Sequence, residues 1–262
     1  HVKRHSFPTR RSSDLLSVPT EESPSEALSL KVTHESHRET APVLAGFFGC
    51  KESDLRNGLG YANDRVEMIS HSGTHLDAPW HYAPQSEGKA ARTIDQIPLE
   101  WCYGDGVVLD FRHKPKGAAI GSADLQRELG RIGYSLQPYD IVLIMTGADK
   151  FWGQAEYFDA GCGMSRESTL WLVEQGIRVM GIDAWGWDRP FWAIKEDFAK
   201  TGDRNILWEA HLAGIEREYC HLEKLANLDK LPRPFGFKVA CFPVKLAGGS
   251  AGWCRAVALV EK

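Results

Sequence analysis

The chain has 262 residues, of which 43% are hydrophobic, and it carries a formal net charge of −4 at pH 7. An acidic chain is a poor candidate for binding nucleic acid, which needs a basic surface. No apolar run approaches the roughly 20 residues of a membrane-spanning helix. The length allows one large domain or two small ones.

Residues 1–15 are expected to be foreign to the native chain. The stretch HSFPTRRSSDL resembles the translation of a sequencing-adapter oligonucleotide, and it lacks the apolar region of a secretory signal. We therefore interpret 1–15 as an artefact. It carries four basic side chains and one acidic one, so the rest of the chain has 27 basic and 34 acidic side chains, a net charge of −7.

Residues 16–29 are polar, with Pro19 and Pro24, and are expected to form a flexible lead-in to one domain that spans 30–262. His34 and His37 follow in the sequence THESH. These two histidines could form a metal pair, but a solvated polar segment is the preferred interpretation.

The stretch SHSGTHLDAPWHY (70–82) gathers His71, His75, Asp77 and His81 within eleven positions. In an extended chain, alternate residues share one face, so the first three side chains are expected to converge on one point. Imidazole together with carboxylate suits Zn²⁺, Mn²⁺ or Fe²⁺. Three protein ligands leave coordination positions open, which is typical of a catalytic metal. His81 lies beyond Pro79, where it is a candidate for proton transfer. The alternative is a set of ordinary polar strand residues.

Strand-like and helix-like segments then alternate. We predict strands over 106–111, 140–147 and 179–184, and helices over 122–133, with Ser122 as N-cap, and over 165–176, with Ser165 as N-cap and Gly176 at the end. This order predicts an α/β fold with some parallel strand pairing.

An aromatic segment, DAWGWDRPFWAIKED (183–197), contains Trp185 and Trp187. It could form a lid over a planar substrate, or it could pack on the core or on a partner subunit. Trp80 and Ser250 are further candidate substrate contacts. Ser250 lies in a glycine-rich turn, 248–252, that lets the backbone approach a ligand but could equally be a plain hairpin turn.

The C-terminal part is predicted to hold two strands, 235–246 and 254–260, joined by that turn. His113 and His221 are interpreted as surface residues. The six cysteines include no CxxC pair, which favours reduced thiols in a cytoplasmic protein. Cys220 and Cys241 have no activating neighbours in the sequence and are expected to be small buried residues.

The segment HSGTHLDAPWH resembles the HxGTHxDxPxH signature of the metal-dependent cyclase family, which includes bacterial kynurenine formamidases and isatin hydrolases. Further similarity lies in 140–147, 165–183, 223–231 and 248–259, so the resemblance covers roughly residues 60–260. It implies a single α/β domain with a mixed sheet in a three-layer β/β/α arrangement. It also implies a homodimer or homotetramer.

The resemblance further implies one or two divalent metals per chain, zinc or manganese. One metal would be held by His71, His75 and Asp77, and the other by Asp77, His211 and Glu223, with Glu223 as a candidate bridge. His81 would take the family's acid–base role.

Two departures from the family pattern leave the substrate open. LKVTHESHRETAP (30–42) replaces an Asp-Trp-Pro-Gly-type stretch that helps to form the substrate pocket in kynurenine formamidases. The segment 184–205 is longer and more aromatic than expected.

The sequence therefore predicts a metal-dependent hydrolase of an amide C–N bond in a small, aromatic substrate. The best candidate reaction is the hydrolysis of N-formylkynurenine to kynurenine and formate. The alternatives are a cyclic-amide hydrolase of the isatin type and a metal-binding protein without activity.

Overall fold

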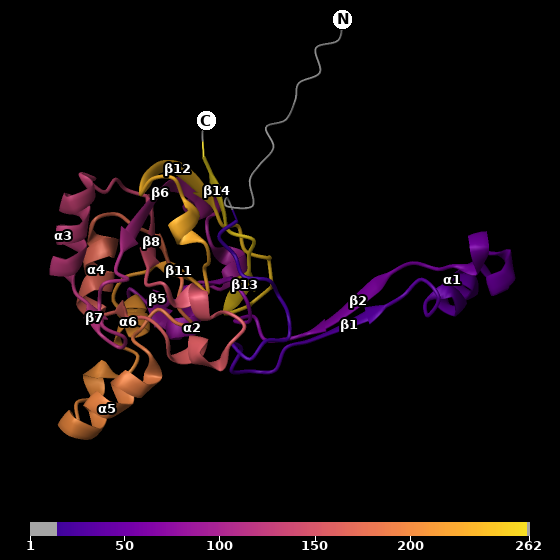
Figure 1. Ribbon diagram of the computed structural model, residues 1–262, viewed down its shortest axis with the longest axis horizontal. Helices are drawn as coiled ribbons and strands as arrows, with labels where there is room; N and C mark the ends of the chain where they lie inside the picture. The colour runs from indigo at the N-terminus through magenta and orange to yellow at the C-terminus, as the bar shows by residue number, and fades with distance from the viewer. Residues whose placement is uncertain (1–14, 261–262) are drawn as a thin grey trace, which may run out of the picture.

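An eight-stranded mixed sheet organises the computed structural model, which describes residues 15–260 (Figure 1). In spatial order its strands are β13 (Ala251–Trp253), β3 (His75–Asp77), β11 (Cys220–Glu223), β10 (Val179–Ile182), β8 (Ile141–Met145), β6 (Tyr103–Asp110), β12 (Phe235–Ala240) and β14 (Val257–Leu259). The four central strands β11, β10, β8 and β6 are parallel, and the strands on either side are antiparallel. The predicted artefact at 1–15 lies, except for Leu15, outside the described residues.

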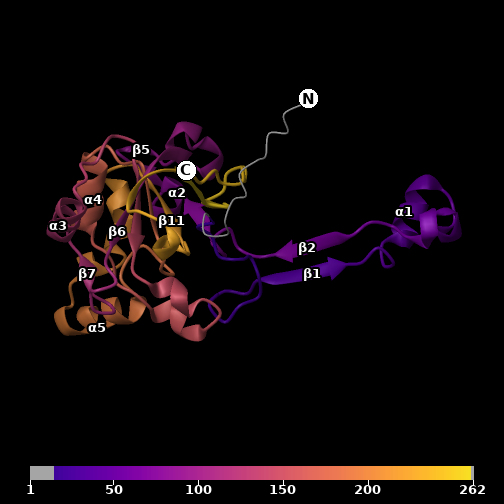
Figure 2. The same cartoon turned by 45° about the horizontal axis from the view of Figure 1, so that its top comes forward.

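Helices pack on one face of this sheet, as Figures 1 and 2 show for α3 (Ser122–Ile132) and α4 (Arg166–Glu174). The other helices are α1 (Ala41–Phe48), α2 (Pro79–Tyr82), α5 (Phe191–Thr201) and α6 (Glu209–Leu212). Small two-stranded sheets pair β1 (Lys31–Glu35) with β2 (Asn63–Glu67), β4 (Gln85–Ser86) with β5 (Lys89–Ala90), and β7 (Ala119–Ile120) with β9 (Gly163–Met164). Short 3-10 turns lie at Glu52–Asp54, Arg56–Gly58, Ile94–Gln96, Leu99–Cys102, Ala148–Phe151, Ala155–Asp159, Arg204–Ile206, Ala213–Ile215 and Leu228–Lys230.

Two hydrophobic cores lie on opposite faces of the central strands. In β8, Val142 and Ile144 join Leu125 of α3 and Leu172 of α4 in the first core. The other residues of β8 point to the second core, whose further members come from β3, β11, β12 and β14 rather than from a long helix. The sheet therefore curls around the second core, and the predicted single α/β domain with a mixed sheet and two β layers is confirmed.

The predicted central elements are present, with one difference at a helix start. The predicted strands 106–111, 140–147 and 179–184 correspond to β6, β8 and β10. The hydroxyl of Ser165 caps α4, accepting a hydrogen bond from the Ser168 amide. Ser122 is instead the first residue of α3, because the Asp124 carboxylate accepts the Gly121 amide at 2.9 Å and makes Gly121 the N-cap.

The C-terminal strands do not form the predicted hairpin. β12 and β14 are paired, but β13 lies between them in sequence and at the opposite edge of the sheet, where it pairs with β3. The glycine-rich stretch 248–252 therefore leads into a separate strand instead of turning the chain back. This crossing brings Ser250 close to β3.

The segment 16–29, expected to be flexible, packs against the body of the protein. Leu16 is fully buried, and its amide donates to the Ala256 carbonyl at 3.0 Å. Glu26 is also tied down, because its carboxylate accepts the Lys224 ammonium at 2.6 Å. The burial of Leu16 in the second core and the ion pair of Glu26 therefore hold the segment against the body, although its composition is polar.

A long arm projects from the body (Figures 1 and 2). It consists of the paired strands β1 and β2 with α1 at its tip, and it occupies the region where the sequence departs from the family pattern. Every residue of β2 is exposed, and so are Phe47 and Phe48 of α1, at 74% and 71%. His34 is also exposed, beside Asp64, as expected for a solvated segment.

Within residues 15–260, no helix is long and apolar enough to cross a membrane. The six cysteines are free thiols, and Cys220 and Cys241 are fully buried, which confirms their interpretation as small core residues. Burial raises the pKa of the Cys220 thiol well above its usual value, so this sulfur is a poor nucleophile.

Candidate metal centre

Strand pairing brings two distant pairs of polar residues together. The short strand β3 runs antiparallel to β11, with Asp77 opposite His221 and His75 opposite Glu223. Alternate residues of a strand point to the same face, so these four side chains gather on one side of the sheet. All four are buried, with exposures between 0% and 6%. The predicted convergence of His75 and Asp77 is therefore present.

His71 and His75 direct ring nitrogens at the same carboxylate. The Nδ1 atom of His71 lies 2.8 Å from Asp77 Oδ1, and the Nε2 atom of His75 lies 3.2 Å from that oxygen. The opposite nitrogen of His75, Nδ1, donates to the Gly73 carbonyl at 2.9 Å. A proton fixed on Nδ1 leaves the lone pair of Nε2 free, which is the arrangement of a metal-ligating histidine.

His211 reaches the same group from α6. Its Nε2 atom lies 3.4 Å from Glu223 Oε1 and 3.9 Å from Asp77 Oδ2. The Asp188 carboxylate holds the other side of the ring through Nδ1 and also accepts the His211 amide at 3.1 Å. The two residues that the family resemblance assigned to the second metal, His211 and Glu223, are therefore adjacent, and Asp188 positions one of them.

His221 belongs to this centre, although it was predicted to be a surface residue. It is fully buried, and its Nε2 atom lies 3.1 Å from both Asp77 Oδ2 and Glu223 Oε1. The surface prediction for His221 is wrong because it did not take the spacing from Glu223 into account. In a strand, His221 and Glu223 are two positions apart and share a face, so their spacing in CHLE was the available signal.

Both carboxylates are ionised. Burial alone would raise the pKa of Asp77, but His75 and His81 hold that pKa well below its usual value. Burial likewise opposes ionisation of Glu223, and hydrogen bonds from His211 and His221 outweigh it and hold its pKa well below the usual value. Within residues 15–260, neither carboxylate pairs with a lysine or an arginine, and the ionisable side chains that contact them are histidines.

The unpaired atoms of the centre match a divalent metal. Both carboxylate oxygens of Asp77 and the Nε2 atom of His75 are buried without a hydrogen-bond partner among the described residues. Buried polar atoms are rarely left unsatisfied, and exceptions point to an ion or water. Suitable donor atoms fall into two groups, Asp77 with His211, His221 and Glu223, and Asp77 with His71 and His81. This buried histidine and carboxylate cluster fits a divalent metal site.

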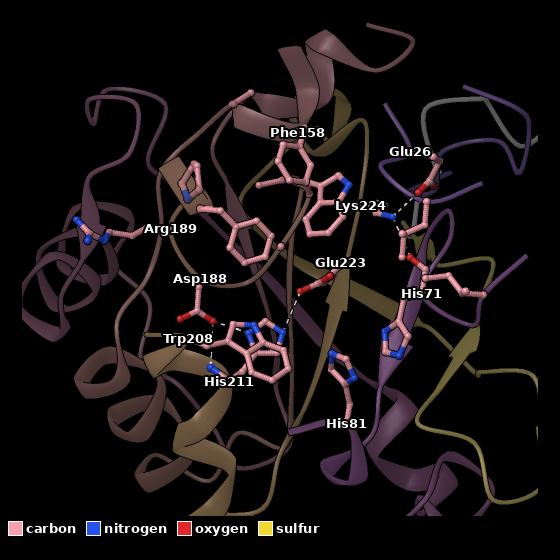
Figure 3. Close-up of a pocket in the computed structure, with 18 residues that line it drawn as sticks. Glu26, His71, His81, Phe158, Asp188, Arg189, Trp208, His211, Glu223 and Lys224 are labelled. Atoms are coloured by element: carbon pink, nitrogen blue, oxygen red, sulfur yellow. Dashed lines mark hydrogen bonds and ion pairs between the residues drawn. The ribbon is translucent and has the colours of Figure 1, made fainter. Parts of the chain in front are cut away.

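A cavity of about 270 Å³ opens beside the centre (Figure 3). His81 lies at its wall, with its side chain 24% exposed and its Nε2 atom 3.8 Å from Asp77 Oδ2. Burial lowers the pKa of His81 to about 4, which leaves the ring neutral at neutral pH. His71, His211 and Glu223 line the same cavity, so the centre is open to a ligand on this side.

The candidate substrate contacts have different positions. Trp185 and Phe191 of the aromatic segment line the cavity, together with Phe158 and Trp208, which the sequence did not indicate. Trp187 is fully buried behind the centre, where its amide donates to Glu223 Oε1 at 2.8 Å. Trp80 is 45% exposed and does not line the cavity. Ser250 contacts His71 instead, with its hydroxyl 3.0 Å from Nε2. The aromatic segment thus supplies both a cavity wall and core packing.

Two cations also line the cavity, and both are paired. The Lys224 ammonium contacts the Glu26 carboxylate and donates to the His71 carbonyl at 2.9 Å. Arg189 contacts Asp197 at 2.8 Å. The sequence did not indicate the pair between Lys224 and Glu26, since the two residues are 198 positions apart.

A family model described as "Putative cyclase" matches residues 16–189. The chain is 30% identical over 193 residues to a kynurenine formamidase of Erythrobacter litoralis, covering 74% of each chain. It is 27% identical over 220 residues to an isatin hydrolase of Roseibium aggregatum, covering 79% of this chain and 78% of the relative.

Among solved structures, an isatin hydrolase bound to the product analogue thioisatinate superposes with a TM-score of 0.72. The match covers 95% of this chain and 92% of that one at 21% identity, so it shows a common fold.

Proposed function

The chain belongs to the cyclase family of metal-dependent hydrolases, and from that premise we propose that it hydrolyses the amide C–N bond of a small aromatic substrate. The observation that carries the proposal is the adjacency of the buried cluster around Asp77 to a cavity lined by Trp185, Phe158 and Trp208. Aromatic walls stack on a planar ring, while the histidine and carboxylate cluster holds the metal beside it.

The protein's own groups have distinct roles in this reaction. His71, His75 and Asp77 would hold one divalent metal, and Asp77, His211 and Glu223 a second. When bound, such a metal supplies Lewis acidity that polarises a carbonyl and lowers the pKa of water. His81 takes the proton of the attacking water and returns it to the leaving nitrogen. Its neutral ring and its place at the cavity wall support this role.

The preferred substrate is N-formylkynurenine, an aryl formamide that yields kynurenine and formate. The similarity to the kynurenine formamidase of Erythrobacter litoralis supports this choice. A cyclic amide of the isatin type is the second candidate. The pairing of Lys224 with Glu26 and of Arg189 with Asp197 favours it, because among the described residues 15–260 the cavity then offers no unpaired lysine or arginine to a charged amino-acid tail.

Side-by-side assays of the purified protein test the proposal. With zinc or manganese added, we expect hydrolysis of at least one of the two amides, measured by loss of ultraviolet absorbance and by mass spectrometry of the product. Chelator-treated protein is the matched control and should be inactive. Tightly bound metal together with no turnover of either amide would favour the alternative of a non-catalytic metal-binding protein.

We also propose that the protein is a homodimer joined through its arm. An isolated two-stranded ribbon is marginally stable in water, and α1 exposes Phe47 and Phe48 at its tip. The ribbon carries charges of both signs, with Lys31 and Arg65 against Glu35 and Asp64. A surface that carries both signs of charge does not repel a second copy of itself across a two-fold axis. The arm is therefore expected to pack on a partner subunit.

Light scattering after size-exclusion chromatography measures the mass directly. The wild-type protein is expected to have twice the chain mass of 29.3 kDa, and the double variant Phe47→Ser, Phe48→Ser the mass of one chain. Leu99→Ser, which changes a side chain that is 63% exposed on the body, is the control and should remain dimeric. A monomeric wild-type protein, or an unchanged mass for the double variant, would contradict the proposed interface.

A further inference from the structure

His221 is held more tightly than a surface or packing residue requires. Its ring is nearly parallel to two neighbouring aromatic rings, with centroids 5.2 Å apart for Tyr82 at an interplanar angle of 13° and 5.3 Å apart for Trp187 at 14°. The residue has no exposed surface. This stacking fixes the plane of the imidazole, so its nitrogens can point in only one direction.

The hydrogen bonds around the ring are compatible with a free lone pair on Nε2. The Nδ1 atom lies 3.0 Å from the Tyr82 hydroxyl, and that hydroxyl can donate its own hydrogen to the Asp77 carbonyl at 3.5 Å. Nε2 contacts Glu223 Oε1 at 3.1 Å. A metal would take the place of the proton in that contact, and His221 would then donate through Nδ1–H. A hydrogen-bonded partner on the far nitrogen is the usual way in which a protein orients a ligating histidine.

The donor atoms of Asp77, His211, His221 and Glu223 lie within 4.8 Å of one another, close enough to surround one ion. Ligands about 2.0–2.2 Å from a tetrahedral metal lie roughly 3.3–3.6 Å from one another. His221 Nε2 is 3.1 Å from Asp77 Oδ2 and 3.1 Å from Glu223 Oε1. The Nε2 atom of His211 is 3.4 Å from the same Glu223 oxygen and 3.9 Å from the same Asp77 oxygen.

We propose that His221 is a fourth protein ligand of the second metal position, together with Asp77, His211 and Glu223. This inference rests on the proposed metal-dependent function and goes beyond the three ligands that the family resemblance implies. Four protein ligands close a tetrahedral site, as in structural zinc centres, whereas three leave a position for water or substrate.

The two positions therefore differ in role. The second metal position, closed by four protein ligands, fixes Asp77 and Glu223 in place. The first metal position, formed by His71, His75 and Asp77, is the one that meets substrate. The surroundings agree with this division. His211 and Glu223 reach the cavity wall with side chains that are only 5% and 8% exposed, whereas that of His71 is 19% exposed, and His221 is not among the lining residues.

The variant His221→Phe tests the ligand role, because phenylalanine keeps a flat ring beside Tyr82 and Trp187 but has no donor nitrogen. Elemental analysis of zinc-loaded protein is expected to give two metals per chain in the wild type and one in the variant, since His71, His75 and Asp77 are unchanged. His113→Phe, which removes an exposed histidine, is the matched control and should keep two.

The other outcomes would contradict either the ligand assignment of His221 or the proposed function. Two metals per chain in His221→Phe with unchanged zinc affinity would overturn the ligand assignment, as would a wild-type protein that never takes more than one. A wild-type protein that binds no metal would instead overturn the proposed function itself.

A measurement without a substitution covers the case in which the variant does not fold. The visible absorption of the Co²⁺-loaded wild-type protein should be intense, as expected for a four-coordinate site without inversion symmetry. Weak absorption at two Co²⁺ per chain would mean that both ions are six-coordinate, and it would overturn the closed position.

Discussion

His81→Ala is expected to lower kcat by about 10²–10⁴-fold, the usual contribution of a general acid–base, while the protein keeps its metal. The Nε2 atom of His81 is 3.8 Å from Asp77 Oδ2, and its ring is partly exposed to the cavity, so it can reach a bound substrate. Steady-state kinetics and elemental analysis on the same preparation separate the two effects. KM should change much less than kcat, because the imidazole acts in proton transfer rather than in holding the substrate.

Added imidazole gives a further check on that role. A small base that diffuses into the space left by the ring should restore part of the lost rate in His81→Ala. It should do nothing for a variant that has lost its metal. If His81→Ala keeps a wild-type kcat, another group transfers the proton; if it loses metal, His81 is a ligand of the centre.

The sequence was sufficient for the central motif because its geometry is local. His75 and Asp77 are two positions apart, and a strand of three residues is enough to turn both side chains to one face. His81 is one helical turn further, on α2, which begins at Pro79. The local pattern therefore predicted which of these residues converge.

Long-range pairing was not predictable in the same way. His221 enters the centre because β11 pairs with β3 at a separation of about 140 residues, and nothing in CHLE alone indicates that partner. The segment around Leu16 and Glu26 was read as flexible for the same reason. Its composition is polar, but its anchoring contacts are all with residues distant in the sequence, such as Thr74, Gln154 and Lys224.

Composition also did not predict which tryptophan lines the cavity and which packs in the core. Trp185 and Trp187 are neighbours in DAWGWD, yet the first faces the cavity and the second is buried against His221. Which of them meets substrate depends on the direction of the loop after β10. That direction is fixed by the bond from the Trp187 amide to Glu223, a contact 36 residues away.

Asp77→Asn should remove both metals and lower kcat/KM by more than about 100-fold. Asp77 is the shared residue of the centre, with Oδ1 facing His71 and His75 and Oδ2 facing His221. Asparagine keeps the shape but replaces one anionic oxygen by a donor NH₂ group, which cannot ligate a cation. Since losing even an outer-shell partner costs 10–100-fold in metal affinity or activity, loss of a shared ligand should cost more.

Elemental analysis, thermal unfolding and kinetics on Asp77→Asn measure these effects together. Bound metal stabilises the folded state by mass action, so the Tm of the variant should equal that of chelator-treated wild type and should not respond to added zinc. Asp105→Asn, which changes a carboxylate that is 54% exposed, is the control and should behave as the wild type. The loss of both metals is expected because both would be bound by this one carboxylate. If Asp77→Asn keeps its full metal complement, the two metal positions do not share Asp77.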